Sequence, residues 1–132
     1  MIEPVKRPSI LFVEDEIELA ENMRELLEDS KFKFIHSTKY IDAMVKTENQ
    51  RFDCILTDIN LDQGTGDALI DSIRNRPNSP NFDTPIIVLS SHIDQKLVKK
   101  VAGKIQGAFV KPYDFDEVLD KVNELLGRGA DS

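Results

Sequence analysis

Short apolar runs alternate along the chain with longer segments of helical spacing. Five runs have the length of buried strands, and each precedes apolar residues at three- and four-residue intervals, as on one helix face. The runs are residues 10–13, 32–36, 54–57, 86–89 and 108–110. The helical segments begin at Ile17, Ile41, Ala68, Ile93 and Phe115. Strand and helix in repeated alternation predict an α/β fold, with a parallel sheet covered by helices on both faces.

The composition of the runs predicts where each strand lies in the sheet. Residues 10–13 and 86–89 are almost wholly apolar, as expected of central strands buried on both faces. Residues 32–35 alternate more, which indicates a position nearer an edge. Segment 75–85 holds three prolines and three asparagines and is expected to be a loop. Residues 127–132 are expected to be a flexible tail or the start of a linker.

Size and charge limit the classes of function. The 132 residues, 40% of them hydrophobic, suit one domain with its own core. A lone Cys54 cannot form an internal disulfide, which fits a reducing compartment. The net charge of −7 opposes attraction to nucleic acid and anionic lipid, and no apolar run is long enough to span a bilayer. We therefore expect a cytoplasmic protein with no direct nucleic-acid or membrane partner.

Polar side chains follow four of the five apolar runs. Glu14 and Asp15 follow the first run, Asp58 the third, Ser90 the fourth and Lys111 the fifth. The strands of a parallel sheet end at one edge, where open α/β folds bind ligands. The pattern therefore predicts that three carboxylates, a hydroxyl and an ammonium group converge there.

Ordinary structural roles explain some of these residues singly. Asp15 and Glu18 have the spacing of a helix-capping box, and Ser90 is placed to cap the helix near Ile93. Lys111 before a proline also suits a solvated strand end. Asp58 precedes a loop and has no adjacent helix to cap. The joint pattern favours a functional site over these separate explanations.

The chemistry of such a cluster follows from its charge. Three neighbouring carboxylates raise one another's pKa unless a cation lies among them, and Mg²⁺ prefers such oxygen ligands. A carboxylate can also attack phosphorus and form an aspartyl phosphate, whose oxygens an ammonium and a hydroxyl group stabilise.

Over residues 8–126 the chain resembles a receiver domain of the bacterial two-component response-regulator family. The matching residues are the acidic pair Glu14 and Asp15, the phospho-acceptor Asp58, the switch hydroxyl Ser90, the pair Lys111 and Pro112, and Gly66 eight residues after the acceptor. The resemblance implies a doubly wound, flavodoxin-like sheet of five parallel strands in the order 2-1-3-4-5, flanked by five helices. Residues 1–7 would then be an N-terminal extension.

The resemblance also implies a function. Asp58 would accept a phosphoryl group from a histidine of a sensor kinase or phosphotransfer domain, and the chain would switch conformation through Ser90 and Lys111. Mg²⁺ would be bound by Glu14, Asp15, Asp58 and the backbone carbonyl of Asn60. We expect the chain to catalyse only its own phosphorylation and dephosphorylation, and to signal to an unknown output partner or C-terminal effector.

The sequence departs from the family pattern at two places. Asp62 stands where the family often has proline, which adds a carboxylate near the metal. The switch aromatic usually lies three residues before the lysine, where this chain has Ala108, while Phe109 lies two before. Alternation along the strand would put Phe109 and Lys111 on the same side. Either Phe109 or no aromatic then serves as the switch residue.

Three further features keep alternatives open. By resemblance, Asn60 and His92 tune the lifetime of the phosphorylated form, although His92 is equally explained as an exposed residue at a helix start, and His36 as a strand-end residue. Lysines of the fourth helical segment and acidic residues of the fifth have opposite charges. They either form a complementary interface between two copies of the chain or are two solvated surfaces. These residues are Lys96, Lys99, Lys100 and Lys104, and Asp114, Asp116, Glu117, Asp120 and Glu124.

Two other functions are considered, one from the chemistry of the site and one from the fold. A Mg²⁺-dependent aspartyl-phosphate phosphohydrolase resembling the haloacid-dehalogenase type usually has a second aspartate two residues after the nucleophile, where this chain has Asn60. A flavin mononucleotide module needs a first loop that cradles phosphate, but Glu14, Asp15 and Glu16 would repel it.

Overall fold

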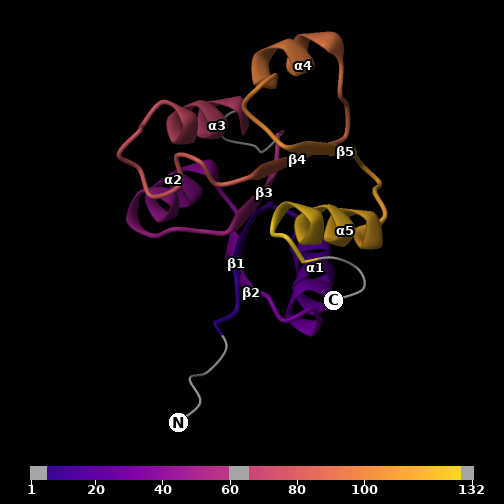
Figure 1. The fold of residues 1–132 in the computed structure, drawn as a ribbon. Coiled ribbons are helices and arrows are strands. Elements are labelled where there is room, and N and C mark those ends of the chain that lie inside the picture. Colours follow the sequence, from indigo (N-terminus) through magenta and orange to yellow (C-terminus); the bar gives the residue numbers. More distant parts are fainter. Residues whose placement is uncertain (1–5, 60–65, 129–132) are drawn as a thin grey trace.

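The computed structural model describes residues 6–59 and 66–128 (Figure 1). Its parallel strands form one sheet in the order β2-β1-β3-β4-β5, which confirms the predicted fold and strand order. The strands are β1 (Ser9–Val13), β2 (Lys33–Ser37), β3 (Cys54–Asp58), β4 (Ile86–Ser90) and β5 (Gly107–Val110). The helices are α1 (Ile17–Asp29), α2 (Tyr40–Asn49), α3 (Gly66–Arg74), α4 (Gln95–Val101) and α5 (Phe115–Leu125).

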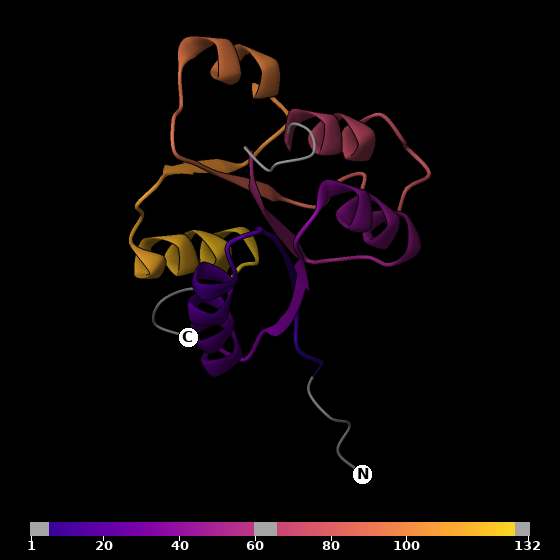
Figure 2. The same ribbon diagram turned by 180° about the vertical axis from the view of Figure 1, so that it is seen from behind.

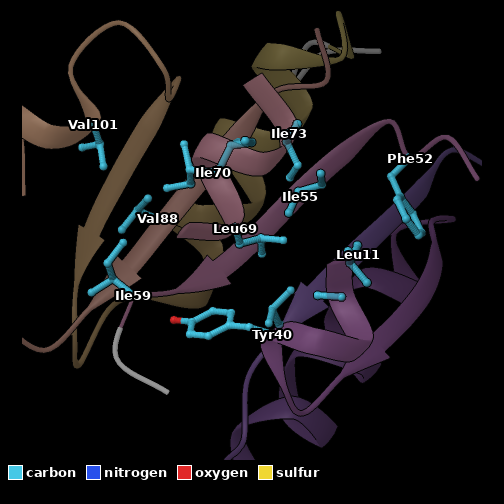
Figure 3. Close-up of a cluster of buried hydrophobic side chains, with 13 residues drawn as sticks. Leu11, Tyr40, Phe52, Ile55, Ile59, Leu69, Ile70, Ile73, Val88 and Val101 are labelled. Atoms are coloured by element: carbon cyan, nitrogen blue, oxygen red, sulfur yellow. The ribbon is translucent and has the colours of Figure 1, made fainter. Parts of the chain in front are cut away.

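Helices cover both faces of the sheet, α1 and α5 on one and α2, α3 and α4 on the other (Figures 1 and 2). Successive side chains of a strand point to opposite faces, so each strand contributes to two cores. In β1, Ile10 and Phe12 pack with α1 and α5, while Leu11 and Val13 pack with α2 and α3. Figure 3 shows the second of these cores.

The register of the strands aligns their carboxyl ends. Val13 of β1 pairs with Thr57 of β3, Asp58 with Leu89 of β4, and Ser90 with Val110 of β5. The residues that follow these strands therefore meet at one edge of the sheet, as the sequence predicts.

The two edge strands are β2 and β5. Lys33 of β2 is exposed, in agreement with the predicted position near an edge. All five residues of β3 and of β4 are buried, because these strands lie inside the sheet and are covered on both faces.

Segment 75–85 is a loop, as predicted, and lies at the opposite edge of the sheet from the carboxyl ends. Buried polar side chains hold it there. Asn81 accepts from the backbone amide of Phe52 at 2.8 Å, and the Thr84 hydroxyl donates to the Phe52 carbonyl at 3.0 Å. Arg74, at the end of α3, donates to the backbone carbonyls of Phe82 and Thr84.

The sequence offers Ser90 and Asp15 as capping residues, and the structure places other residues at the starts of both helices. Helix α4 begins at Gln95, later than the expected start at Ile93, and its cap is Asp94, whose carboxylate accepts from the Leu97 amide at 2.8 Å. Asp94 directly precedes the helix and is therefore better placed than Ser90 to bond its free amides. At helix α1 the N-cap position belongs to Glu16 and not to Asp15, and Glu16 makes no side-chain capping bond.

Among the described residues, no helix has both the length and the apolar character needed to cross a membrane.

Candidate functional site

Three carboxylates form a cluster at the carboxyl edge of the sheet, called the acidic cluster below. Glu14 directly follows β1 and is 1% exposed, Asp58 ends β3 and is 5% exposed, and Asp15 is exposed. One carboxylate oxygen from each residue lies within 4.8 Å of the other two. The structure therefore brings together the three carboxylates expected to bind metal.

Lys111 neutralises part of this charge. Its Nζ lies 2.7 Å from Glu14 Oε1 and 2.7 Å from Asp58 Oδ2. The lysine is brought there by the end of β5, where its backbone amide donates to the Ser90 carbonyl at 2.7 Å, and a cis peptide bond links it to Pro112. Within residues 6–59 and 66–128, Lys111 is the one cation that pairs with carboxylates of the acidic cluster, and it is therefore no solvated strand end.

The imbalance appears in the pKa values of the buried groups. The pKa of Glu14 is raised to about 7, mainly by burial and also by the Asp58 charge, which together outweigh the lowering effect of Lys111. Burial alone would lower the pKa of Lys111, but its bonds to Asp58 and Glu14 outweigh this effect and raise it. Lys111 therefore stays charged, while Glu14 readily takes up a proton near neutral pH.

Ser90 ends β4 and is fully buried. Its hydroxyl donates to the His92 carbonyl at 2.7 Å and accepts from the His92 amide at 3.2 Å. The hydroxyl therefore bonds the start of the loop that leads to α4.

The two candidate positions for a switch aromatic lie on different faces of β5. Phe109 packs against the core shared by α1 and α5. Ala108 instead lines an apolar hollow of about 330 Å³ beneath α4, together with Val88, Leu97 and Val101. The small Ala108 side chain therefore occupies the α4 side of the strand, and no aromatic residue of β5 faces α4.

The remaining candidates occupy surface or undescribed positions. The His92 side chain is 77% exposed, with Nε2 3.6 Å from Asp94 Oδ2, which favours the view of His92 as a residue at a helix start. Asn60, with the carbonyl expected to bind metal, and Asp62 lie outside the described residues.

The lysines of α4 and the turn after it pair within the chain. Lys100 Nζ lies 3.8 Å from Asp67 Oδ2, and Lys104 Nζ lies 2.7 Å from Asp71 Oδ1, both carboxylates belonging to α3. Two of the four lysines considered for a homodimer contact thus bind α3 in the monomer. A homodimer through α4 and α5 stays a prediction.

Two side chains support the acidic cluster from outside, and the sequence gives no motif for either. His36 of β2 donates through Nε2 to the Glu14 carbonyl at 2.7 Å. Tyr40 of α2 donates its hydroxyl to the Asp58 carbonyl at 2.5 Å. The two contacts depend on how β2 and the start of α2 pack against the ends of β1 and β3, which periodicity cannot reveal.

The acidic cluster fits a magnesium ion by its donor set. Its carboxylate oxygens are the hard ligands that Mg²⁺ prefers, and they converge from the ends of two adjacent strands. The excess of negative charge left by Lys111 also favours a divalent cation.

Comparisons with known proteins agree with this arrangement. The family model of the response regulator receiver domain matches residues 10–123. The response regulator ArlR of Staphylococcus saprophyticus is 32% identical over 122 residues, which are 90% of this chain and 52% of that protein. Hybrid signal transduction histidine kinase D of Dictyostelium discoideum is 27% identical over 122 residues, which are 91% of this chain and 8% of that protein. This chain thus spans about half the length of the first relative and a small part of the second.

A solved structure shows the same fold. The receiver domain of sensor histidine kinase PA1611 from Pseudomonas aeruginosa, which has a magnesium ion coordinated in its active site cleft, matches with a TM-score of 0.81. The two chains are 24% identical, and the match covers 92% of this chain and 99% of that one. Because the family model covers most of its length, this chain belongs to the response regulator receiver domain family.

Proposed function

We propose that the chain is a phosphorylation-dependent switch in which Asp58 accepts a phosphoryl group from a histidine of a sensor kinase or phosphotransfer domain. The observation that carries the proposal is the environment of Asp58. Its buried carboxylate lies in the acidic cluster with Glu14 and Asp15, and 2.7 Å from the ammonium group of Lys111. Family membership supports the same role.

Each side chain has a distinct part in this reaction. An Asp58 oxygen forms a bond to phosphorus while the bond from phosphorus to the donor histidine nitrogen breaks, and the electron pair stays on that nitrogen. Lys111 already bonds an Asp58 oxygen and needs only a small movement to bond a phosphoryl oxygen instead. The Ser90 hydroxyl exchanges the His92 carbonyl for another phosphoryl oxygen, which alters the loop before α4.

Glu14, Asp15 and Asp58 would hold the magnesium ion, with the Asn60 carbonyl as a further ligand. When bound, Mg²⁺ supplies positive charge that offsets the carboxylates and the phosphoryl oxygens. Glu14 binds metal in its ionised form, so the proton that its raised pKa favours must leave first.

The chain acts on itself and not on a separate substrate in this proposal. A phosphohydrolase that uses the same aspartyl phosphate would need a general acid near the nucleophile, and Asn60 offers none at the corresponding position. The kinase partner, the output partner or effector, and the cytoplasmic location belong to the proposal as well.

The proposal is tested by intact-mass measurement after incubation with Mg²⁺ and acetyl phosphate. We expect wild-type protein to gain the mass of one phosphoryl group, and to gain none when a chelator removes Mg²⁺. Asp58→Asn should stay unmodified, while Asp83→Asn, which removes an exposed carboxylate at the other edge of the sheet, should behave as wild type. Equal labelling of Asp58→Asn and wild type would refute the assignment.

A further inference from the structure

The hydroxyl of Tyr40 makes a buried contact with the backbone of Asp58. Tyr40 is the first residue of α2 and is 3% exposed. Its ring lies in the core between α2, α3 and the sheet, with the hydroxyl oxygen toward the end of β3 near Ile59 (Figure 3). The hydroxyl donates to the Asp58 carbonyl at 2.5 Å.

The peptide group after Asp58 is held on both sides. Its carbonyl also accepts from the Thr57 hydroxyl at 3.0 Å, and its amide, that of Ile59, donates to the Leu89 carbonyl of β4 at 3.1 Å. A peptide group is planar, so fixing its carbonyl and its amide fixes the direction in which the chain leaves Asp58. The Tyr40 bond therefore acts on the backbone that bears the acceptor carboxylate.

The same segment of the chain holds the other buried carboxylate residue. His36 donates to the Glu14 carbonyl, and the Glu14 amide donates to the Ser37 carbonyl at 2.9 Å. Lys46 of α2 in turn donates to the His36 carbonyl and to the Ser37 hydroxyl, at 2.8 and 3.1 Å. Residues 36–40 thus bond the backbone at the ends of β1 and β3, the two strands that carry the acidic cluster.

Core packing accounts for the ring of Tyr40 but not for its hydroxyl. A phenylalanine ring would fill nearly the same volume among the apolar side chains of this core. The hydroxyl instead bonds a carbonyl that belongs to the acceptor residue. Its contribution can therefore be separated from packing by one substitution.

We propose that Tyr40 is a positioning residue for the acceptor: its hydroxyl fixes the Asp58 backbone so that the carboxylate stays aligned with Glu14, Asp15 and Lys111. This role rests on the proposed function of Asp58. Residues that orient metal ligands from outside the coordination shell typically contribute tenfold or more to metal affinity or activity. We expect Tyr40→Phe to weaken Mg²⁺ binding and to slow phosphorylation, each about tenfold.

The test compares Tyr40→Phe with a matched substitution far from the acidic cluster. Thr84→Val also removes a buried hydroxyl that donates to a backbone carbonyl, that of Phe52, at the opposite edge of the sheet. Thr84→Val should lose at least as much stability in urea unfolding as Tyr40→Phe, because the Thr84 hydroxyl also lies 3.0 Å from Asn81 Oδ1. Calorimetry gives the Mg²⁺ dissociation constant, and intact mass gives the phosphorylation rate at saturating Mg²⁺ and acetyl phosphate.

A third measurement uses metal-free protein. In Tyr40→Phe the Ile59 amide should exchange with solvent faster than in wild type, because the carbonyl of its peptide group has lost one of its bonds. In Thr84→Val the exchange of Ile59 should match wild type, as should Mg²⁺ affinity and phosphorylation rate.

The outcomes separate this role from the proposed function. Slower phosphorylation and weaker Mg²⁺ binding in Tyr40→Phe alone support the positioning role. Rates and affinities equal to wild type, or equally reduced in both variants, overturn it. Failure of wild-type protein to take up any phosphoryl group would overturn the proposed function, and the ratio of Mg²⁺ affinities would still decide whether Tyr40 orders the acidic cluster.

Discussion

Two clusters of buried polar side chains lie at opposite edges of the sheet. They differ in how completely their hydrogen bonds and charges are matched by partners. At the amino-terminal edge, the Asn81 side chain accepts from the Phe52 amide and the Thr84 hydroxyl, and donates to the carbonyls of Thr47 and Gln50. All of these contacts are 3.0 Å or shorter and join neutral groups. Every hydrogen-bonding position of the amide has a partner.

At the carboxyl-terminal edge the polar groups carry charge that does not balance. Glu14 and Asp58 are buried like Asn81, at 1% and 5% exposure against 0%, and both pair with the same ammonium group, that of Lys111. Burying charge without full compensation costs stability, whereas a fully bonded neutral amide contributes to it. The amino-terminal edge thus stabilises the fold, whereas the excess negative charge at the carboxyl-terminal edge is what the proposed binding of a cation would offset.

The largest expected effect on stability is at the satisfied edge. Asn81→Ala removes all four hydrogen bonds, including those to the buried Phe52 amide and Thr47 carbonyl, which should lower the free energy of unfolding by about 4 kcal/mol. Urea unfolding measures this loss, with Asn78→Ala, an exposed residue of the same loop, as the control. Folded Asn81→Ala protein should still be phosphorylated at the wild-type rate. A loss below about 1 kcal/mol would show that the hydrogen bonds of Asn81 do not stabilise the fold more than ordinary surface contacts do.

The next effect concerns Glu14 and pH. Its pKa rises from 4.5 in the unfolded chain to about 7 in the folded one, so between these values the native state binds more protons than the unfolded state. Metal-free protein should therefore lose stability through Glu14 as pH rises from 4.5 to 7, by on the order of 3 kcal/mol.

The substitution Glu14→Gln isolates this contribution, because glutamine does not titrate. Relative to wild type, the variant should gain stability as pH rises over that range, in urea unfolding measured with a chelator present. Saturating Mg²⁺ should offset the decline in wild type alone. A constant difference between the two proteins across the range would show that Glu14 does not carry the proton.

The smallest effect is expected for charge at the surface. Lys104 and Asp71 form an ion pair at 2.7 Å, but their side chains are 38% and 45% exposed. Lys104→Met should therefore change the free energy of unfolding by no more than about 0.5 kcal/mol at moderate salt. A larger loss would mean that the contact between α3 and α4 depends on this pair, and that burial is not what distinguishes the charges of the acidic cluster.

The sequence predicts the members of the acidic cluster because their position in the fold follows from their position after an apolar run. Glu14, Asp58 and Lys111 each follow an apolar run, and parallel strands end at a common edge. The same reasoning orders the strands only with the help of family resemblance, since periodicity does not say which strands are neighbours.

Other features depend on contacts between segments far apart in the chain. Tyr40 reads in the sequence as one more residue at the start of an apolar helix, and its bond to Asp58 exists only because α2 packs over the end of β3. The start of α4 was expected at Ile93, yet the nearer carboxylate of Asp94 sets it two residues later. The side of β5 that Ala108 and Phe109 occupy likewise required the structure.

The most direct test of the central claim is to locate the phosphoryl group on the chain. An acyl phosphate is reduced by borohydride to an alcohol, so protein treated with Mg²⁺ and acetyl phosphate, then reduced and digested, should contain homoserine at position 58. We predict this product at Asp58 alone, and its loss when Mg²⁺ is removed. Reduction of a phosphorylated Glu14 would not give homoserine, because glutamate has one more carbon. Homoserine at position 15 would instead identify Asp15 as the acceptor. A product at Asp15, or none at Asp58, would contradict the account.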